Sequence, residues 1–203
     1  MRGMSFSKIL ALALLAIALA KPLQAQGSDA SDLFGGYHEK GSQIISITTG
    51  AGIPLFIFPA SADPGEDRPL KVGASFNLSY RYFIADRVTL GGGLTGAFNG
   101  TVGGRTLFLA PVTVGAAWWW NSAALEGTAG LDVGMNVMRL SGNGMLTPFA
   151  KAGTGLFYRI SGGWSLGAQL YGWLIPEIHT GDYSELTRYG TELELSISAL
   201  YHF

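Results

Sequence analysis

The sequence contains no cysteine, and charged residues are scarce in its 203 positions. The absence of cysteine excludes a disulfide framework, thiolate metal sites and a lipid-bearing N-terminal cysteine. Lys, Arg, Asp and Glu make up 13% of the chain, which is about half the average for soluble domains. The formal net charge is −1, so the chain offers no basic surface and no nucleic-acid partner is expected.

The sequence also lacks an apolar run as long as the ~20 residues that a membrane-spanning helix requires. Beyond the N-terminal region, the longest clear apolar run covers residues 53–60, and Pro54 and Pro59 interrupt it. Yet 48% of the residues are hydrophobic and 30 are glycine. This composition is unlike that of an ordinary soluble domain, and it excludes strong disorder because the chain can bury ample apolar surface.

The N-terminal region has the organisation of a secretory signal peptide. Arg2 and Lys8 precede an apolar run of 12 residues at positions 9–20, and Leu23-Gln24-Ala25 follows it. A positive start, a short apolar stretch and small residues before the cleavage point are typical of such signals. We expect a signal peptide at residues 1–25 and a polar periplasmic lead-in at residues 26–40.

Alternation of apolar and polar residues dominates the rest of the sequence. It is clearest in residues 71–82 and 192–203, where every second residue is apolar. Weaker copies lie at residues 45–55, 88–98, 108–118, 125–137, 150–158 and 166–174. Alternation of period 2 predicts strands with one apolar face. Eight such segments without a spanning helix predict an all-β fold, a transmembrane eight-stranded antiparallel up-and-down β-barrel over residues 41–203.

The predicted connections alternate in length. Short turns are expected near residues 85–87, 121–123 and 161–163, and longer links at residues 58–69, 99–105, 139–144 and 176–187. Outer-membrane barrels have short periplasmic turns and longer outer loops, so both termini are expected on the periplasmic side. Aromatic residues near the strand ends, Trp119 and Trp173 among them, are interpreted as the girdles of such a barrel.

Eight charged residues fall within the predicted strands, all on the polar face: Lys71, Arg81, Glu126, Asp132, Lys151, Arg159, Glu192 and Glu194. A charge that faces lipid at mid-depth costs about 2–4 kcal/mol, so an apolar face free of charge favours contact with lipid. Unpaired charges in a narrow lumen are also costly. We therefore expect these eight residues to form an ionic network that fills much of the lumen. Separate hydration in an open pore is the alternative.

A secreted soluble β-barrel or β-sandwich is the alternative fold, with its apolar face turned inward. The residues of the polar face argue against it, because Gly, Ser and Thr dominate that face. A water-facing surface is normally much richer in Lys and Glu.

The signal peptide, the eight alternating segments and the C-terminal sequence LSISALYHF resemble the small eight-stranded outer-membrane proteins of the OmpX, OmpA-barrel and OmpW type. The resemblance implies a monomer in the bacterial outer membrane, in contact with outer-membrane lipid. It also implies the insertion machinery and periplasmic chaperones as partners during assembly. The residues that resemble the C-terminal assembly signal of this class are Leu195, Ile197, Ala199, Tyr201 and Phe203.

The leading functional hypothesis is a role in envelope structure or surface-loop interaction, with a narrow, charge-filled lumen. A porin-like conduit for small solutes, hydrophobic ones included, is the alternative that the OmpW type suggests. No enzymatic activity, cofactor or metal site is expected, because the three histidines, His38, His179 and His202, are scattered without the spacing of metal ligands. Only His179 has triad-type neighbours in the sequence, namely Asp182, Ser184 and Glu185, and we interpret these as a solvated loop.

Overall fold

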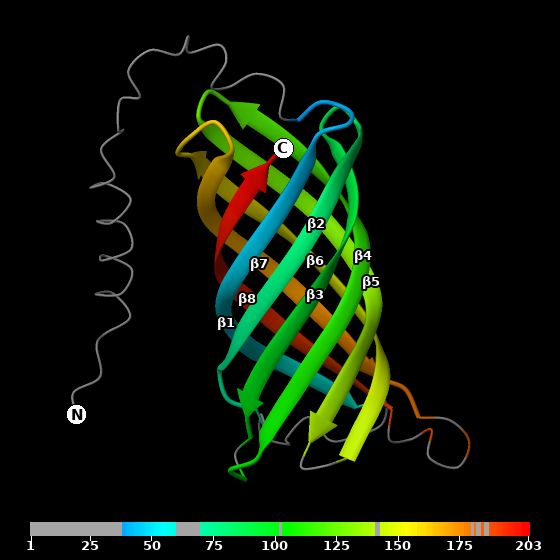
Figure 1. The fold of residues 1–203 in the computed structure, drawn as a ribbon. Helices are drawn as coiled ribbons and strands as arrows, with labels where there is room; N and C mark the ends of the chain where they lie inside the picture. Colours follow the sequence, from blue (N-terminus) through cyan, green and yellow to red (C-terminus); the bar gives the residue numbers. More distant parts are fainter. Residues whose placement is uncertain are drawn as a thin grey trace, which may run out of the picture. The chain divides into compact units, whose positions relative to one another are not determined.

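The computed structural model describes residues 38–59, 70–101, 103–140, 143–179, 181, 184 and 187–203. They form eight strands: β1 (Gln43–Pro59), β2 (Gly73–Ala85), β3 (Val88–Gly100), β4 (Thr106–Ser122), β5 (Leu125–Leu140), β6 (Asn143–Arg159), β7 (Trp164–Glu177) and β8 (Arg188–His202). Each strand pairs antiparallel with its neighbours in the chain, and β8 pairs with β1 to close the sheet (Figure 1). The predicted eight-stranded up-and-down barrel is confirmed.

Side chains alternate between the interior and the outside of the barrel, as the sequence pattern predicts. In β2, Phe76 and Leu78 are exposed on the outside, whereas Ser75 and Asn77 are buried inside. The same division holds in the other strands, so that Leu, Ile, Val and aromatic side chains cover the outer surface. An exposed apolar surface of this extent is typical of a barrel that contacts lipid. Among the described residues, no helix has the length and apolar character needed to cross a bilayer.

One irregularity interrupts the alternation in β1. The pairing of β1 with β8 shifts between Pro54 and Phe56, which leaves Leu55 as an extra residue. A β-bulge of this kind reverses the direction of the side chains that follow it. Phe56 is therefore 54% exposed, although unbroken alternation would turn it inward.

The two ends of the barrel differ in their connections. Short turns join β2 to β3 through Asp86-Arg87, β4 to β5 through Ala123-Ala124, and β6 to β7 through residues 160–163, as expected. Arg87 and Ala123 have φ angles of 64° and 50°, the left-handed conformation that tight turns use. These turns lie at the end where β1 begins and β8 ends, here called the terminal end; the opposite end is the loop end (Figure 1).

The prediction of a longer link at residues 139–144 is wrong. β5 continues to Leu140 and pairs there with Asn143 of β6, so only two residues connect the strands. The predicted signal peptide at residues 1–25 lies outside the described residues, as does most of the expected lead-in, of which residues 38–40 form a turn before β1.

Candidate functional site

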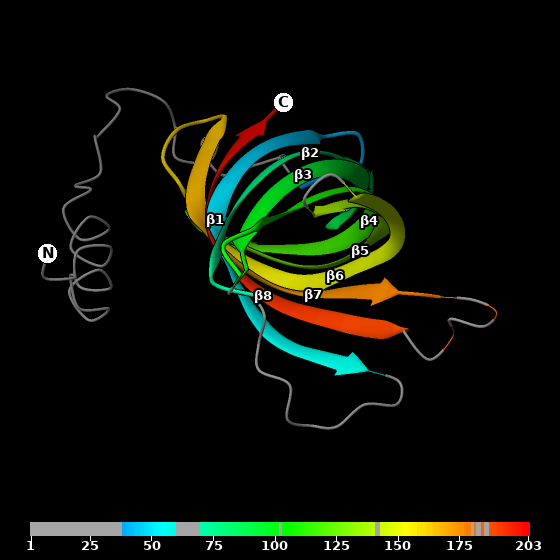
Figure 2. The ribbon, with the colours of Figure 1, turned by 90° about the horizontal axis from the view of Figure 1, so that it is seen from below.

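The barrel interior is packed with side chains in three successive zones. Buried apolar residues form a terminal-end cluster that consists of Ile44, Phe83, Ala117, Trp119, Phe157 and Leu200. A loop-end cluster consists of Ala97, Leu107, Leu109, Phe149, Tyr171, Trp173 and Ile175. Charged and polar side chains occupy the space between the two clusters and beside them. The view along the barrel shows the strands curving around this interior (Figure 2).

An ion pair between β2 and β5 lies in the middle zone. The Nη2 atom of Arg81 donates to both carboxylate oxygens of Asp132, at 2.8 and 2.9 Å. Lys151 of β6 is the direct cross-strand neighbour of Asp132, and its ammonium nitrogen lies 5.1 Å from the ring centre of Tyr171. A buried pair of this kind compensates charges that would otherwise be costly to remove from water.

Two carboxylates of β8 face the loop-end half of the interior. Glu194 accepts hydrogen bonds from the hydroxyl of Ser75 at 2.7 Å and from the indole N–H of Trp173 at 2.9 Å. Glu192 accepts a longer one, 3.4 Å, from the side-chain amide of Asn99. Neutral donors therefore satisfy Glu194 and approach Glu192.

Seven of the eight charged residues that the sequence assigned to the lumen are buried in the interior: Arg81, Glu126, Asp132, Lys151, Arg159, Glu192 and Glu194. Lys71 is the exception. It is exposed and precedes β2, whose pairing begins at Gly73, so its inclusion in the lumen is wrong. Of these eight described residues, three basic and four acidic ones therefore lie in the interior, rather than four of each. The long side chain of Arg81 reaches from the terminal half of β2 to Asp132 in the middle zone.

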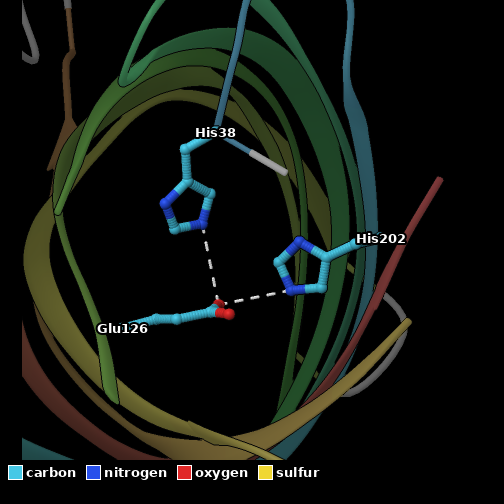
Figure 3. A group of neighbouring side chains, drawn as sticks. All are labelled: His38, Glu126 and His202. Carbon is cyan, nitrogen blue, oxygen red and sulfur yellow. Dashed lines mark ion pairs between the residues drawn. The ribbon is translucent and has the colours of Figure 1, made fainter. Parts of the chain in front are cut away.

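A second charged group lies at the terminal end, where Arg159 of β6 pairs with the Oε1 atom of Glu126 on β5. The other oxygen of Glu126 faces two imidazoles: the Nε2 atom of His202 lies 3.3 Å away and that of His38 lies 3.7 Å away (Figure 3). Ser165 contacts both sides of this group, 3.3 Å from Glu126 Oε1 and 3.2 Å from His202 Nε2.

No pattern in the sequence indicates that His38 joins this group. His38 lies in the expected polar lead-in, yet it is buried, and its ring centre is 5.4 Å from those of both Phe83 and Trp119. The inference that the histidines are scattered holds along the chain but not in space, because the closure of β1 against β8 brings His38 and His202 together.

The interpretation of Trp119 and Trp173 as girdle residues is wrong. Both side chains point inward and are 3% and 2% exposed, respectively. Trp118, which precedes Trp119 in β4, points outward and is 50% exposed. Strand parity alone separates Trp118 from Trp119, so this signal was present in the sequence.

A small cavity remains between the two apolar clusters. Its volume is about 30 Å³, and its lining includes Ser46, Arg81, Asp132 and Lys151. This is room for about two water molecules. Between the two clusters, the described side chains therefore leave little space for solvent.

The remaining sequence candidates lie away from the interior. His179 follows β7 at the loop end, where its backbone N–H and C=O both contact the hydroxyl of Thr187. Of its expected neighbours, Asp182 and Glu185 lie outside the described residues, and Ser184 is exposed. The residues of the expected assembly signal alternate along the outward face of β8 and end at Phe203, whose backbone exchanges two hydrogen bonds with Gln43.

A protein-family model matches residues 26–201. The chain belongs to this family. A curated relative, an uncharacterized protein of Treponema pallidum (strain Nichols), is 26% identical over 136 residues, which are 63% of this chain and 62% of the relative. The match therefore spans less than two thirds of that relative's length.

Several solved structures share the fold of this chain. Neisserial surface protein A aligns with a TM-score of 0.60 at 15% identity, covering 81% of this chain and 98% of that one. OprG of Pseudomonas aeruginosa aligns with a TM-score of 0.52 at 12% identity, covering 82% of this chain and 97% of OprG. The N-terminal barrel of Pseudomonas aeruginosa OprF aligns with a TM-score of 0.50 at 14% identity, covering 81% of this chain and 98% of that barrel. The chain therefore has the fold of the small eight-stranded outer-membrane barrels, and that resemblance is confirmed.

Proposed function

We propose that this chain is an integral outer-membrane protein with a closed, charge-filled lumen, which acts in envelope structure or through its surface loops rather than by transport or catalysis. One observation carries the proposal: apolar clusters lie at both ends of the interior, an ion pair lies between them, and the cavity between the clusters is about 30 Å³. A hydrated ion or a small metabolite requires a continuous aqueous path. A space for about two water molecules provides none.

The outer surface supports the proposed location. Exposed apolar side chains cover all eight strands, with Val114 of β4 and Ile197 of β8 63% and 67% exposed. Such a surface is stable against lipid and is an aggregation risk in water. The proposal includes export by the signal at residues 1–25, short turns and both termini in the periplasm, and a monomeric barrel. Insertion machinery and periplasmic chaperones would act on it during assembly.

Current recordings in planar bilayers test the closed lumen. The exported protein, purified from outer membranes, is expected to insert without raising the conductance above that of the protein-free bilayer. The positive control is Trp119→Ala combined with Trp173→Ala, which removes one bulky side chain from each apolar cluster and is expected to introduce measurable current. Its matched control is Trp118→Ala, which changes only an outward side chain.

The recordings also distinguish the closed lumen from the main alternative, an open conduit. Stable channels in the unaltered protein, unaffected by the paired tryptophan substitutions, would contradict the closed lumen and favour a conduit for small solutes. Insertion is checked independently, because folded outer-membrane barrels migrate differently in gels before and after heating.

A further inference from the structure

Three residues from distant parts of the chain converge at the terminal end of the barrel. His38 precedes β1, Glu126 is the second residue of β5, and His202 is the last residue of β8 (Figure 3). Each side chain offers one ligand atom, and these atoms lie within 4.8 Å of one another. All three residues are buried, with exposures of 8%, 1% and 2%.

The donor set is that of a divalent transition-metal site. Two neutral imidazoles and one carboxylate with an open fourth position form a common ligand set for zinc. Zinc-bound nitrogen and oxygen atoms lie about 2.0–2.1 Å from the ion, so tetrahedral ligands are roughly 3.3–3.4 Å apart. The distances from Glu126 Oε2 to the Nε2 atoms of His202 and His38 are 3.3 and 3.7 Å. All three ligand atoms lie within 4.8 Å of one another, so an ion would fit once the two imidazoles move closer together.

The buried atoms also point to an ion. Neither ring nitrogen of His38 makes a hydrogen bond with a described residue, and the same is true of Glu126 Oε2. The ion-pair contacts of Glu126 Oε2 with the two imidazoles are 3.3 and 3.7 Å long, and buried polar atoms without a hydrogen bond are uncommon and costly. The atoms in question face one another, so one cation between them would satisfy His38 Nε2 and Glu126 Oε2 together.

The surroundings fix the orientation of the ligands. Arg159 and Ser165 contact the other oxygen of Glu126, which turns Oε2 toward the imidazoles. Phe83 and Trp119 pack against the ring of His38. Outer contacts of this kind hold metal ligands in place and affect affinity. When an ion occupies His202 Nε2, the hydroxyl of Ser165 retains Glu126 as a partner.

We propose that His38, Glu126 and His202 bind one divalent transition-metal ion of the zinc type. The ion would connect the segment before β1 to the ends of β5 and β8, next to the seam where the barrel closes. Its role would be structural: it would fasten that segment over the terminal-end cluster. Arg159 pairs with the other oxygen of Glu126, so its positive charge would weaken the binding of the ion. This site is independent of whether the lumen conducts.

Zinc titration of the exported protein tests the site. The protein is purified without a histidine tag, stripped with a chelator and titrated with Zn²⁺ in a calorimeter. We expect one ion per chain, a raised unfolding temperature with zinc, and, with Co²⁺, the intense visible absorption of a four-coordinate site. His38→Ala is expected to raise the Kd at least about tenfold and to abolish both other signals. Because His38 precedes the first strand, this variant is expected to fold.

The matched control is His179→Ala, which removes the histidine at the loop end and is expected to bind zinc as the unaltered protein does. His202→Gln provides a second loss-of-ligand variant. Two results would overturn the proposal: no zinc binding by the unaltered protein, or binding that survives His38→Ala unchanged. In either case the three residues form only a cluster of ion-pair contacts around Glu126. Neither result bears on the bilayer recordings, so the two proposals fail separately.

Discussion

Arg81 and Asp132 form an ion pair across the middle of the barrel, with one guanidinium nitrogen 2.8 and 2.9 Å from the two carboxylate oxygens. Both residues are buried, and they come from β2 and β5, which are not neighbours in the sheet. The pair therefore connects opposite parts of the wall through the interior.

Removing one partner of this pair is expected to destabilise the barrel strongly. Asp132→Ala leaves the charge of Arg81 without its partner, and such a change costs about 3–5 kcal/mol. Combining Arg81→Met with Asp132→Leu removes both charges and is expected to recover most of that loss. Urea unfolding in lipid vesicles measures the free energies. Equal destabilisation by the single and the combined substitutions would contradict the pairing.

The indole of Trp173 is expected to stabilise the fold through Glu194. Trp173→Phe keeps an aromatic ring but removes the N–H that donates to the carboxylate at 2.9 Å. Leaving a buried acceptor with one donor fewer costs about 1–3 kcal/mol. Trp118→Phe, on the outward face of β4, is the control and is expected to change the unfolding free energy little. A similar change in both variants would show that the hydrogen bond contributes nothing specific.

Gly153 of β6 is expected to tolerate no side chain. A Cβ atom there would collide with the carbonyl oxygen of Leu170 and with the ring of Tyr171. Overpacking of this kind costs typically about 1–3 kcal/mol. Gly172 of β7 lies on the outward face, where a Cβ atom would meet only the carbonyl of Ala152 at 3.9 Å. Thermal unfolding should therefore separate Gly153→Ala from Gly172→Ala, and indistinguishable midpoints would contradict the steric account.

The C-terminal residue is expected to matter for assembly. Phe203 exchanges backbone hydrogen bonds with Gln43 at 2.9 and 3.1 Å, and its ring stacks on Tyr201 at 5.9 Å. Deleting Phe203 is expected to slow insertion into the outer membrane and to leave the inserted barrel with an unchanged lumen. Pulse-chase labelling with heat-modified gel mobility follows insertion, and Phe203→Tyr is the control that retains an aromatic end. Insertion at the normal rate after the deletion would remove the assembly role.

The strands could be predicted because each has two contrasting environments. Residues on one side contact the apolar surroundings and those on the other enter a narrow interior, so the alternation in β2 and β8 is nearly complete. Strand parity would also have placed Trp119 and Trp173 inside. The proline at position 54 was a signal for the bulge, because proline cannot complete a strand's hydrogen-bond ladder.

The contacts between distant strands could not be predicted in the same way. Arg81 pairs with Asp132 because its side chain crosses the interior. The sequence near either residue does not indicate which strand the other partner comes from. The burial of His38 depends on a turn before β1 that folds over the barrel end. Lys71 was misplaced because the alternation in the sequence begins two residues before Gly73, the first paired residue of β2.

Thiol labelling inside the barrel tests the closed lumen most directly, because the native chain has no cysteine. Ser46→Cys places a near-isosteric thiol at a buried position, 6% exposed, in the lining of the central cavity. Gly103→Cys places one in an exposed turn as the control. A charged, water-soluble thiol reagent is expected to label Gly103→Cys readily and to leave Ser46→Cys unlabelled until the barrel is unfolded. Labelling of Ser46→Cys in the folded protein at a rate close to that of Gly103→Cys would contradict a closed lumen.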